Sequence, residues 1–452
     1  MRLAELAGLR VAIWGLGREG RAALAALRAR VPTLVPSVFC TAQEAAAAAH
    51  DGAVRVIGAP PSVADLSAFD VVIKSPGISA YRPELIEARR NGTRFTSGTA
   101  LWFAEHPQAR VIAVTGTKGK STTSALIAHL LRARGRRVAL AGNIGLPLLD
   151  LLDPAQVPDW WVIELSSFQT REVPHVELAV VTSLVEEHLD WHGDRDRYVD
   201  DKLALVGVAG CLVVNACVDE LVRRTATHPA RRLFGAAAGW HVGADALMCG
   251  TQTVFARAGL AVPGAHNALN ACAALTVLDA VGEDAVAAAP ALATFRPLPH
   301  RLQHLGARDG VDWIDDSIAT TPAATLEALR SLTGKAVVLL VGGYDRGLDW
   351  SAFATALRDH APQAVIANGA NRARIVHELH RAGVPNVHGE ATLAAAIVRA
   401  RELARPGAAI LLSPGAPSFD QFGDYAERGA AFAVAGGFDP RWIGQIEGLG
   451  IH

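Results

Sequence analysis

The sequence predicts a three-domain α/β protein in which each domain is built on a mainly parallel sheet. Short β-branched runs alternate with alanine- and leucine-rich helical segments along most of the chain, as they do in doubly wound sheets. Glycine-rich turns join a strand to a helix at residues 15–20 and again at residues 116–119. The chain of 452 residues is too long for one hydrophobic core, and at about 150 residues per domain it suggests three.

We expect a Rossmann-like first domain over residues 1–107. A central domain with a parallel sheet of the P-loop ATPase type follows over 108–297, and a C-terminal Rossmann-like domain over 298–452. The first boundary lies where the strand-helix pattern breaks around residues 105–108, and the second lies in the proline-punctuated segment 296–301.

Composition argues against several classes of protein. Half of the residues are hydrophobic (50%) and the formal net charge is −1 without a basic run, so we expect neither nucleic acid nor a membrane as partner. The five cysteines lack metal-type spacing, which is typical of reduced thiols. Arg2, Glu5 and Arg10 interrupt any signal-peptide core, and Pro263 and several polar residues break the uncharged stretch 258–278. We expect a cytoplasmic monomer.

The first segment contains a glycine fingerprint after its first strand. A strand over residues 10–14 is followed by Gly-Leu-Gly-Arg-Glu-Gly over 15–20 and then by a helix. This pattern is typical of dinucleotide sites, but the acidic residue expected after the second strand is missing, which disfavours NAD and favours another nucleotide or phosphate. A later strand over 70–74 runs into Ser75-Pro76-Gly77 at the same edge of the sheet.

The second segment opens with a phosphate-binding loop. An apolar strand over 111–115 leads into Gly116-Thr117-Lys118-Gly119-Lys120-Ser121-Thr122, and a helix follows as far as Gly135. Glycines let backbone N–H groups turn toward phosphate, while Lys120 can reach the terminal phosphates and Ser121 can bind Mg²⁺. Val114 stands where the general pattern has its first glycine. The alternative is a glycine turn beside a surface lysine.

Polar residues follow the next three predicted strands, which span 137–140, 160–163 and 177–182. These residues are Asn143, Glu164 and His188, and a helical stretch beyond them carries Tyr198 and Lys202. Because the carboxyl ends of parallel strands meet at one sheet edge, we expect these side chains near the phosphate loop. A carboxylate there suits a nucleotide-bound Mg²⁺, and the alternative is an acid that caps a helix.

The third segment alternates strands and helices again. Strands are expected over 311–314, 336–341, 364–367 and 408–412. The loops after these strands carry polar and glycine residues, among them Asp316, Arg346 and Ser413. This pattern predicts another doubly wound sheet with a ligand edge of its own.

Taken in order, these loops resemble the Mur ligase family, the ATP-dependent amino-acid ligases that build the peptidoglycan stem peptide. The resemblance covers essentially the whole chain and rests on residues 116–122, 142–145, 164–169, 188–193 with Lys202, 266–270, 299–301, 316–317 and 413–415. It implies a ligase that uses ATP and Mg²⁺, forms ADP and phosphate, and adds glutamate to UDP-N-acetylmuramoyl-L-alanine through an acyl phosphate. Such an enzyme serves cell wall biogenesis, cell shape and cell division.

The resemblance also implies roles for individual residues. The implied catalytic set is Lys120, Glu164, His188 and Lys202, and the implied Mg²⁺ ligands are Ser121, Glu164, His188 and Lys202. An ammonium group cannot bind a cation, but the family converts the lysine at the place of Lys202 to an anionic carbamate; the alternative is a solvated helix lysine. ATP would be held by Gly116, Thr117, Lys118, Gly119, Lys120, Ser121, Thr122, Asn267, Arg301 and Asp316. The UDP-sugar would be held by Gly15, Leu16, Gly17, Arg18, Ser75, Pro76, Gly77, Asn143 and His188, and glutamate by Thr320, Arg346, Ser413 and Phe419.

Two residues bear on the chirality of the glutamate. Ile318 and Arg346 each stand where the D-glutamate-adding pattern has a lysine. The first change removes a cation, and the second supplies a planar guanidinium that binds carboxylate bidentately. Together with the 15–20 turn and the closing residues 448–452, they resemble a less common subgroup that adds L-glutamate. We therefore expect L-glutamate, with D-glutamate as the alternative.

More distant functions are also open. A folylpolyglutamate synthase-like ligase shares the phosphate loop and the modified lysine but needs no UDP-binding first domain. A catalytically silent nucleotide-binding regulator would keep the fold, although Lys120, Glu164, His188 and Lys202 are all intact. A P-loop switch GTPase is disfavoured because no guanine-reading Asn-Lys-x-Asp follows. With ligands divided among three domains, we expect closure when ATP binds.

Overall fold

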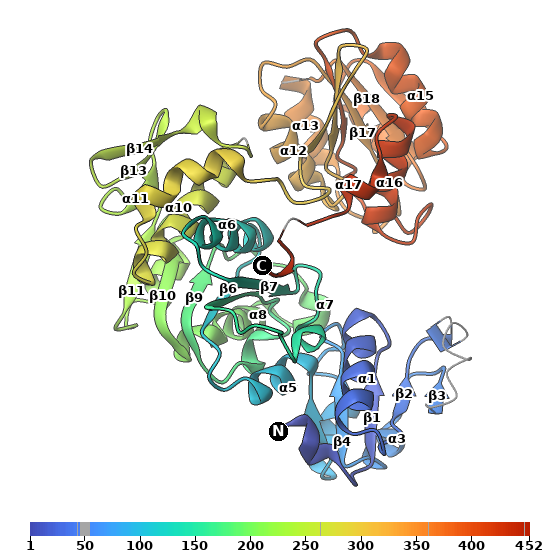
Figure 1. Ribbon diagram of the computed structural model, residues 1–452. Coiled ribbons are helices and arrows are strands. Elements are labelled where there is room, and N and C mark those ends of the chain that lie inside the picture. Colours follow the sequence, from blue (N-terminus) through green and yellow to red (C-terminus); the bar gives the residue numbers. More distant parts are fainter. Residues whose placement is uncertain (43, 46–54, 263, 360, 447) are drawn as a thin grey trace. The chain divides into compact units, whose positions relative to one another are not determined.

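The computed structural model describes residues 1–42, 44–45, 55–262, 264–359, 361–446 and 448–452 (Figure 1). The chain forms two compact units. Unit 1 comprises Met1–Leu260, His266–Thr294 and Gly448–His452, and unit 2 comprises Ala261–Ala265 and Phe295–Glu447. The last residues of the chain therefore belong with unit 1.

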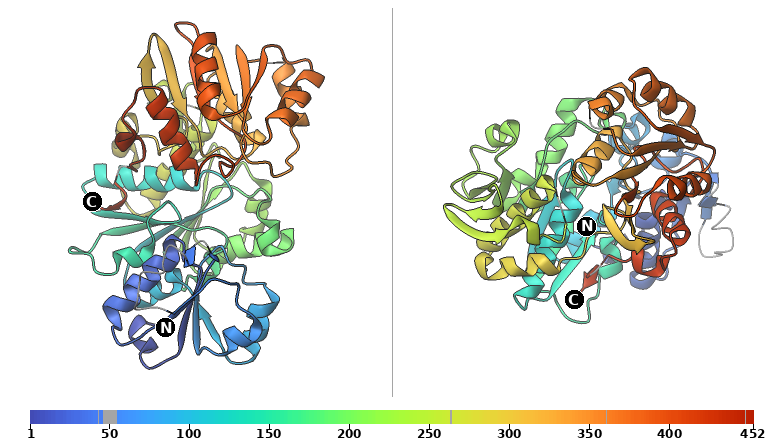
Figure 2. Two further views of the ribbon diagram at one scale, coloured as in Figure 1. Left: turned by 90° about the vertical axis from the view of Figure 1, so that its right-hand side faces the viewer. Right: turned by 90° about the horizontal axis from the view of Figure 1, so that it is seen from above.

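The N-terminal part of unit 1 is a parallel five-stranded sheet. Its strands, in the order β3-β2-β1-β4-β5, are β1 (Val11–Trp14), β2 (Ser37–Phe39), β3 (Arg55–Ile57), β4 (Val71–Lys74) and β5 (Arg94–Thr96). Helices cover both of its faces (Figure 2); they include α1 (Arg18–Arg30), α3 (Val63–Ser67) and α4 (Pro83–Arg90). Strands β1 and β4 are neighbours although they are not consecutive, and ligands of such sheets bind where the strand order reverses in this way.

A second, seven-stranded sheet forms the centre of unit 1. After α5 (Gly98–Glu105) come β6 (Val111–Thr115), β7 (Val138–Gly142), β8 (Trp160–Glu164), β9 (Val176–Val181), β10 (Ala209–Asn215), β11 (Arg231–Phe234) and, from the end of the chain, β21 (Gly450–Ile451). Their order is β11-β10-β9-β6-β8-β7-β21, and every pair is parallel except β7 with β21. Every residue of β6 and β8 is buried, as expected for central parallel strands.

Helices and a small sheet complete unit 1. The helices are α6 (Lys120–Ala133), α7 (Leu189–His192), α8 (Arg195–Lys202), α9 (Asp219–Arg224), α10 (Ala265–Ala280) and α11 (Ala285–Ala288). The small sheet is antiparallel and consists of β12 (Trp240–Val242), β13 (Ala246–Cys249) and β14 (Gln252–Ala256).

Unit 2 is a six-stranded sheet with a core on each face. Its strands, in the order β15-β16-β20-β17-β18-β19, are β15 (Gln303–Arg308), β16 (Val311–Asp315), β17 (Val337–Val341), β18 (Ala364–Asn368), β19 (Val387–Glu390) and β20 (Ala409–Leu412); only β15 runs antiparallel. Its helices are α12 (Pro322–Arg330), α13 (Ser351–Asp359), α14 (Arg372–Arg381), α15 (Leu393–Leu403), α16 (Tyr425–Ala435) and α17 (Pro440–Ile443). Alternate residues of β17 pack into opposite cores, as Leu339 does beside Phe353 of α13 and Leu340 beside Phe432 of α16.

The predicted fold class is confirmed, because the structure is a mixed α/β fold built on parallel sheets. The strands that were not predicted are short, lie at sheet edges or have mixed exposure; they are β3, β5, β10, β11, β12, β13, β14, β15, β19 and β21. Residues 448–452 were expected with the C-terminal domain, but β21 pairs with β7 of unit 1 instead.

Two expectations from composition can be compared with the structure. All five cysteines carry free thiols. Over the ranges that the structure describes, no helix is both long and apolar enough to cross a membrane.

Candidate active site

The loop between β6 and α6 has the backbone of a phosphate site. Gly116 has φ +141° and Gly119 has φ +82°, a region that side chains other than glycine rarely adopt. A Cβ on Gly116 would collide with Thr182, and one on Gly119 would lie 2.6 Å from Asn270 Oδ1. Gly119 is also the N-cap residue of α6, so the loop presents the N-terminal N–H groups of a helix to an anion.

Residues at the end of β9 hold this loop in place. The amide of Lys118 donates to Ser183 Oγ at 2.7 Å, and Thr182 Oγ1 donates to the carbonyl of Lys118 at 2.6 Å. The hydroxyl of Tyr198, on α8, lies 2.6 Å from Thr117 Oγ1. The sequence prediction placed Tyr198 near this loop but gave it no role. It did not include Thr182 or Ser183, although their place at the end of a neighbouring strand was a usable signal.

Glu164 lies at the end of β8, beside the phosphate loop, and its carboxylate is buried. Its Oε1 accepts a hydrogen bond from Asn143 Nδ2 at 2.8 Å. Its Oε2 is buried and has no hydrogen-bond partner among the described residues. An orphaned carboxylate oxygen at this sheet edge fits a Mg²⁺ ligand, because hard oxygen donors are what this cation requires. Ser121, the other Mg²⁺ ligand predicted at the phosphate loop, lies in the first turn of α6.

Lys202 is buried, which contradicts the alternative of a solvated helix lysine. It is the last residue of α8 and is 3% exposed. Its Nζ donates to the carbonyl of Gly116 at 3.0 Å and lies 5.0 Å from the ring centroid of Tyr198. Burial, with the nearby charge of Lys120, lowers the pKa of Lys202 to about 7. Lys120 itself donates from Nζ to the carbonyl of Thr117 at 3.0 Å.

His188 is the N-cap residue of α7 and has a left-handed backbone, with φ +57°. Positive φ is uncommon outside glycine and is concentrated at functional sites. The imidazole is half exposed, and its ring packs edge-on against Phe168 with centroids 5.2 Å apart. Partial burial lowers the pKa of His188; the charges of Glu187 and Asp190 oppose this shift, and those of Lys202 and Lys120 add to it.

The predicted UDP-sugar loops meet at the switch point of the first sheet. Ser75 donates from its amide to the carbonyl of Trp14 at 2.9 Å and from Oγ to the carbonyl of Gly15 at 3.2 Å. Arg18 Nη1 donates to the carbonyl of Gly145, in the turn that follows Asn143, at 3.2 Å. The structure therefore brings residues 15–18 and the 75–77 loop together within unit 1, and places Arg18 against the turn that follows Asn143. Leu16 is buried, so only its backbone can face a ligand there.

Helix α10 lies beside the phosphate loop through Asn270, which packs against Gly119. Asn270 Nδ2 donates to Oδ1 of Asn267, a predicted ATP ligand, at 3.4 Å. Asn270 belongs to the motif at 266–270 but was not among the predicted site residues.

The remaining predicted residues lie in unit 2. Asp316 Oδ2 accepts a hydrogen bond from Ser413 Oγ at 2.7 Å, and Oδ1 accepts one from the amide of Leu302 at 3.2 Å. Burial raises the pKa of Asp316 to about 7, although the hydrogen bonds from Ser413 and Leu302 act to lower it. Ser413, predicted for glutamate, is therefore bonded to a residue predicted for ATP. Thr320 is half-buried, whereas Arg346 and Phe419 are exposed.

The sequence prediction missed Arg428, which contacts the residue next to Asp316. It is buried on α16, donates from Nε to Ser317 Oγ at 3.0 Å and from Nη2 to the carbonyl of Ser317 at 2.8 Å, and so fixes the residue after Asp316. Nothing in the local sequence pattern distinguishes this arginine from the exposed arginines of other helices.

Comparison with known proteins supports a single family. The Mur ligase middle domain matches residues 114–278, and the Mur ligase glutamate ligase domain matches residues 300–415. Proteins named UDP-N-acetylmuramoyl-L-alanine--L-glutamate ligase align over the full length of this chain and of their own: that of Xanthomonas euvesicatoria pv. vesicatoria (strain 85-10) is 50% identical and that of Xylella fastidiosa (strain Temecula1 / ATCC 700964) is 48% identical. A protein of the same name from Micromonospora sp. is 40% identical over 96% of this chain and 98% of its own.

Solved structures of low sequence identity share the fold. UDP-N-acetylmuramate-alanine ligase of Thermotoga maritima superposes with a TM-score of 0.63 at 19% identity, over 94% of this chain and 98% of that one. MurF ligase of Thermotoga maritima, solved in complex with ADP, gives 0.54 at 17% identity over 77% of this chain and 94% of that one. With two matched domain models and full-length relatives at 50% identity, the chain belongs to the Mur ligase family, the ATP-dependent ligases of peptidoglycan synthesis.

Proposed function

We propose that this protein joins L-glutamate to UDP-N-acetylmuramoyl-L-alanine and converts ATP to ADP and phosphate. The observation that carries the proposal is the convergence of Lys120, Glu164 and Lys202 on one sheet edge around the phosphate loop. The substrate assignment rests on the relative that is 50% identical and carries that activity in its name.

The first step activates the carboxylate of the alanyl group. A carboxylate oxygen attacks the γ-phosphorus of ATP, the bond from that phosphorus to the β–γ bridging oxygen breaks, and ADP leaves with the bond electrons. Catalysis of such a transfer consists mainly of positioning and charge stabilisation. The loop amides and Lys120 would hold the β- and γ-phosphates. Glu164 and Ser121 would hold Mg²⁺, which neutralises charge that develops on the phosphate oxygens.

The second step forms the amide bond. The unprotonated amine of glutamate attacks the carbonyl carbon of the acyl phosphate, a tetrahedral intermediate forms, and its collapse expels inorganic phosphate while the amine loses a proton. Thr320, Arg346, Ser413 and Phe419 are our candidates for holding glutamate. Arg301 and Asp316, with Asn267, would hold the adenosine part of ATP.

Lys202 would act as a carbamate. Its neutral Nζ attacks CO₂, a nitrogen-carbon bond forms, and the nitrogen proton passes to solvent, which leaves an anionic carboxylate. Supporting this role, Nζ is buried and lies beside the phosphate loop, where an anion would serve a second Mg²⁺ together with His188. The UDP-sugar would lie over residues 15–18 and 75–77, with Asn143 and His188 near its reacting carboxylate.

Phosphate release tests the proposal directly. The purified protein is supplied with ATP, Mg²⁺ and UDP-N-acetylmuramoyl-L-alanine, and turnover with L-glutamate is compared with turnover with D-glutamate. We expect turnover with the L-isomer and its loss in Lys120→Ala. Turnover with D-glutamate alone would overturn the choice of isomer. Turnover with a folate acceptor but not with the UDP-sugar would place the chain beside folylpolyglutamate synthases.

A further inference from the structure

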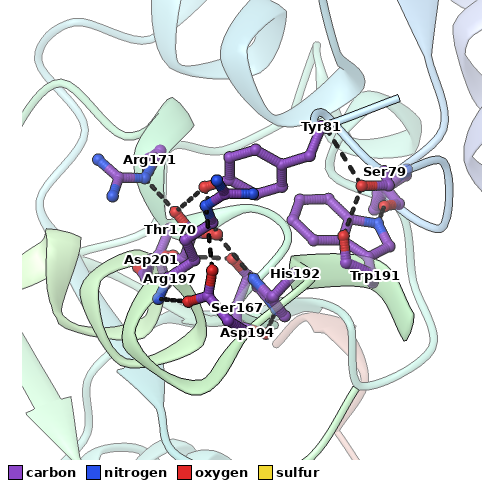
Figure 3. Close-up of polar contacts among 11 residues, drawn as sticks. Ser79, Tyr81, Ser167, Thr170, Arg171, Trp191, His192, Asp194, Arg197 and Asp201 are labelled. Carbon is purple, nitrogen blue, oxygen red and sulfur yellow. Dashed lines mark hydrogen bonds and ion pairs between the residues drawn. The ribbon is translucent and has the colours of Figure 1, made fainter. Parts of the chain in front are cut away.

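Asp201, the residue before Lys202, accepts hydrogen bonds from three different segments (Figure 3). The hydroxyl of Tyr81 lies 2.8 Å from Oδ1 and 2.9 Å from Oδ2, and His192 Nδ1 lies 2.7 Å from Oδ2. Arg171 Nε also donates to Oδ1. The carboxylate is 1% exposed, so these donors replace the water that it has lost.

The network continues from His192 to the strand end that carries Glu164. His192 Nε2 lies 2.9 Å from Ser167 Oγ, three residues beyond Glu164, and Thr170 Oγ1 donates to the carbonyl of Asp201 at 2.5 Å. His192 ends α7, the short helix that His188 caps. Asp201 therefore connects the segments of all three predicted metal ligands that lie beyond the phosphate loop.

The serine, histidine and aspartate of this network occur in the order of a hydrolase triad, but they do not form one. Ser167 is 4% exposed and His192 is fully buried. A nucleophile has to reach its substrate, and this hydroxyl belongs to a buried residue and is hydrogen-bonded to the buried His192. The arrangement therefore serves to hold position.

The loop that follows β4 contacts the same segment at two places. Trp191 Nε1 donates to the carbonyl of Pro76 at 3.0 Å, and Ser79 Oγ donates to the carbonyl of Trp191 at 2.5 Å (Figure 3). Tyr81 packs edge-on against Trp191, with ring centroids 5.7 Å apart, before its hydroxyl reaches Asp201. Pro76 belongs to the predicted UDP-sugar loop, so one short segment links that loop to Asp201.

We propose that Asp201 is a positioning residue for Lys202, and that Tyr81 makes this positioning depend on the UDP-sugar loop. This inference rests on the proposed function, since it assumes that Lys202 is carbamylated. The carboxylate fixes the C-terminal turn of α8, which holds Lys202 Nζ against the phosphate loop. Binding of the UDP-sugar to its loop then favours carbamylated Lys202, because Trp191 and Tyr81 connect that loop to Asp201.

The experiment compares Asp201→Asn with Asp200→Asn in the full-length protein. Asp200 is the neighbouring residue, but its side chain is 60% exposed and forms a 3.7 Å ion pair with Arg224. The carbamate carbon is observed by ¹³C NMR under ¹³CO₂, and kcat and KM are measured separately. For Asp201→Asn we expect carbamate occupancy and kcat to fall about tenfold, with KM for ATP within about twofold, as for loss of one charge-assisted hydrogen bond. Asp200→Asn should match the wild type.

Tyr81→Phe tests the link to the UDP-sugar loop, because it removes only the hydroxyl. In the wild type we expect UDP-N-acetylmuramoyl-L-alanine to raise the carbamate signal, and in Tyr81→Phe we expect this rise to be lost. The basal carbamate signal should fall less than in Asp201→Asn.

The outcomes separate this inference from the proposed function. No carbamate in the wild type refutes carbamylation, and with it the proposed role of Lys202. A normal carbamate signal and normal kcat in Asp201→Asn overturns the positioning role. If activity and carbamate fall only in proportion to the folded fraction, measured by circular dichroism, Asp201 is a purely structural residue and the inference is wrong. An equal rise with UDP-sugar in Tyr81→Phe refutes the link through Tyr81.

Discussion

At the scale of single residues, buried charges gather where the predicted ligand loops lie. Glu164, Asp201 and Lys202 are each at most 3% exposed. A second group joins the two sheets of unit 1: Lys74 Nζ is buried 3.9 Å from Glu172. Burying charge costs free energy unless partners compensate, so such groups persist where function requires them.

Glu19 lies in the first turn of α1. The cost of burying its charge should appear as a dependence of the protein's stability on pH. Burial, together with the charges of Asp150 and Glu172, raises the pKa of Glu19 from 4.5 to about 7. An acid with a raised folded pKa contributes stability at low pH that is lost as pH rises through about 7. At about 1.4 kcal/mol per pKa unit, a shift from 4.5 to about 7 amounts to at most about 3.5 kcal/mol.

We therefore expect Glu19→Gln, which mimics the neutral acid, to melt at a higher temperature than the wild type at pH 8 and to exceed it by a much smaller margin at pH 5, just above the unfolded pKa. Differential scanning fluorimetry at both pH values measures this. Glu87→Gln is the control, because Glu87 is half exposed and forms a 3.0 Å ion pair with Arg90. A gap between Glu19→Gln and wild type that does not widen with pH would contradict the assignment.

At the scale of elements, residues at the ends of strands and at the N-termini of helices form the candidate active site. The apolar pattern of β6 and the glycines after it were sufficient to predict the strand, the turn and α6. Pairing between elements was not predictable in the same way. Strand β21 has only two residues, and β12 to β14 are short with mixed exposure. None of these strands shows an alternation of apolar and polar residues strong enough to predict it from the local sequence.

Helix α6 offers a matched pair of glycines for testing the phosphate loop. Gly119 begins the helix with φ +82° and Gly135 follows its end with φ +77°. A Cβ at Gly119 would meet Asn270, whereas one at Gly135 would meet no described residue within 4 Å. Both alanine variants carry backbone strain of about 1–2 kcal/mol.

We expect Gly119→Ala to weaken ATP binding at least tenfold, the equivalent of about 1.4 kcal/mol, whereas Gly135→Ala should lower the melting temperature and leave ATP affinity unchanged. Isothermal titration with ATP under non-turnover conditions, without the UDP-sugar, measures both. Equal affinities in the two variants would show that the N-terminus of α6 does not bind the nucleotide.

At the scale of the whole molecule, the chain returns to unit 1 after unit 2 is complete. Gly450 and Ile451 pair antiparallel with Leu140 and Ala139 of β7. His452 exchanges backbone hydrogen bonds with Val138, at 2.8 Å and 3.2 Å. Unit 2 is therefore joined to unit 1 at both of its ends, and β21 covers what would be an open sheet edge.

Removal of residues 448–452 should destabilise unit 1 and expose the edge of β7. At about 1 kcal/mol net per hydrogen bond, the loss is about 2–3 kcal/mol. We expect a lower melting temperature and more aggregation in light scattering, because an unpaired strand edge is a template for association. Ile451→Ala, which keeps the backbone pairing, should have a smaller effect. An unchanged melting temperature after truncation would show that β21 adds no stability.

The sequence alone determined the fold class, the order of the ligand loops and the chemistry of their side chains. It could do so because strand and helix periodicity, glycine turns and motif residues are local properties of the chain. Tertiary structure decided that Lys202 is buried, that one oxygen of Glu164 has no hydrogen-bond partner among the described residues, and that Asp201 joins Tyr81 to His192. Those properties depend on contacts between residues as much as 120 positions apart, and no local pattern records which distant donor will reach a given carboxylate.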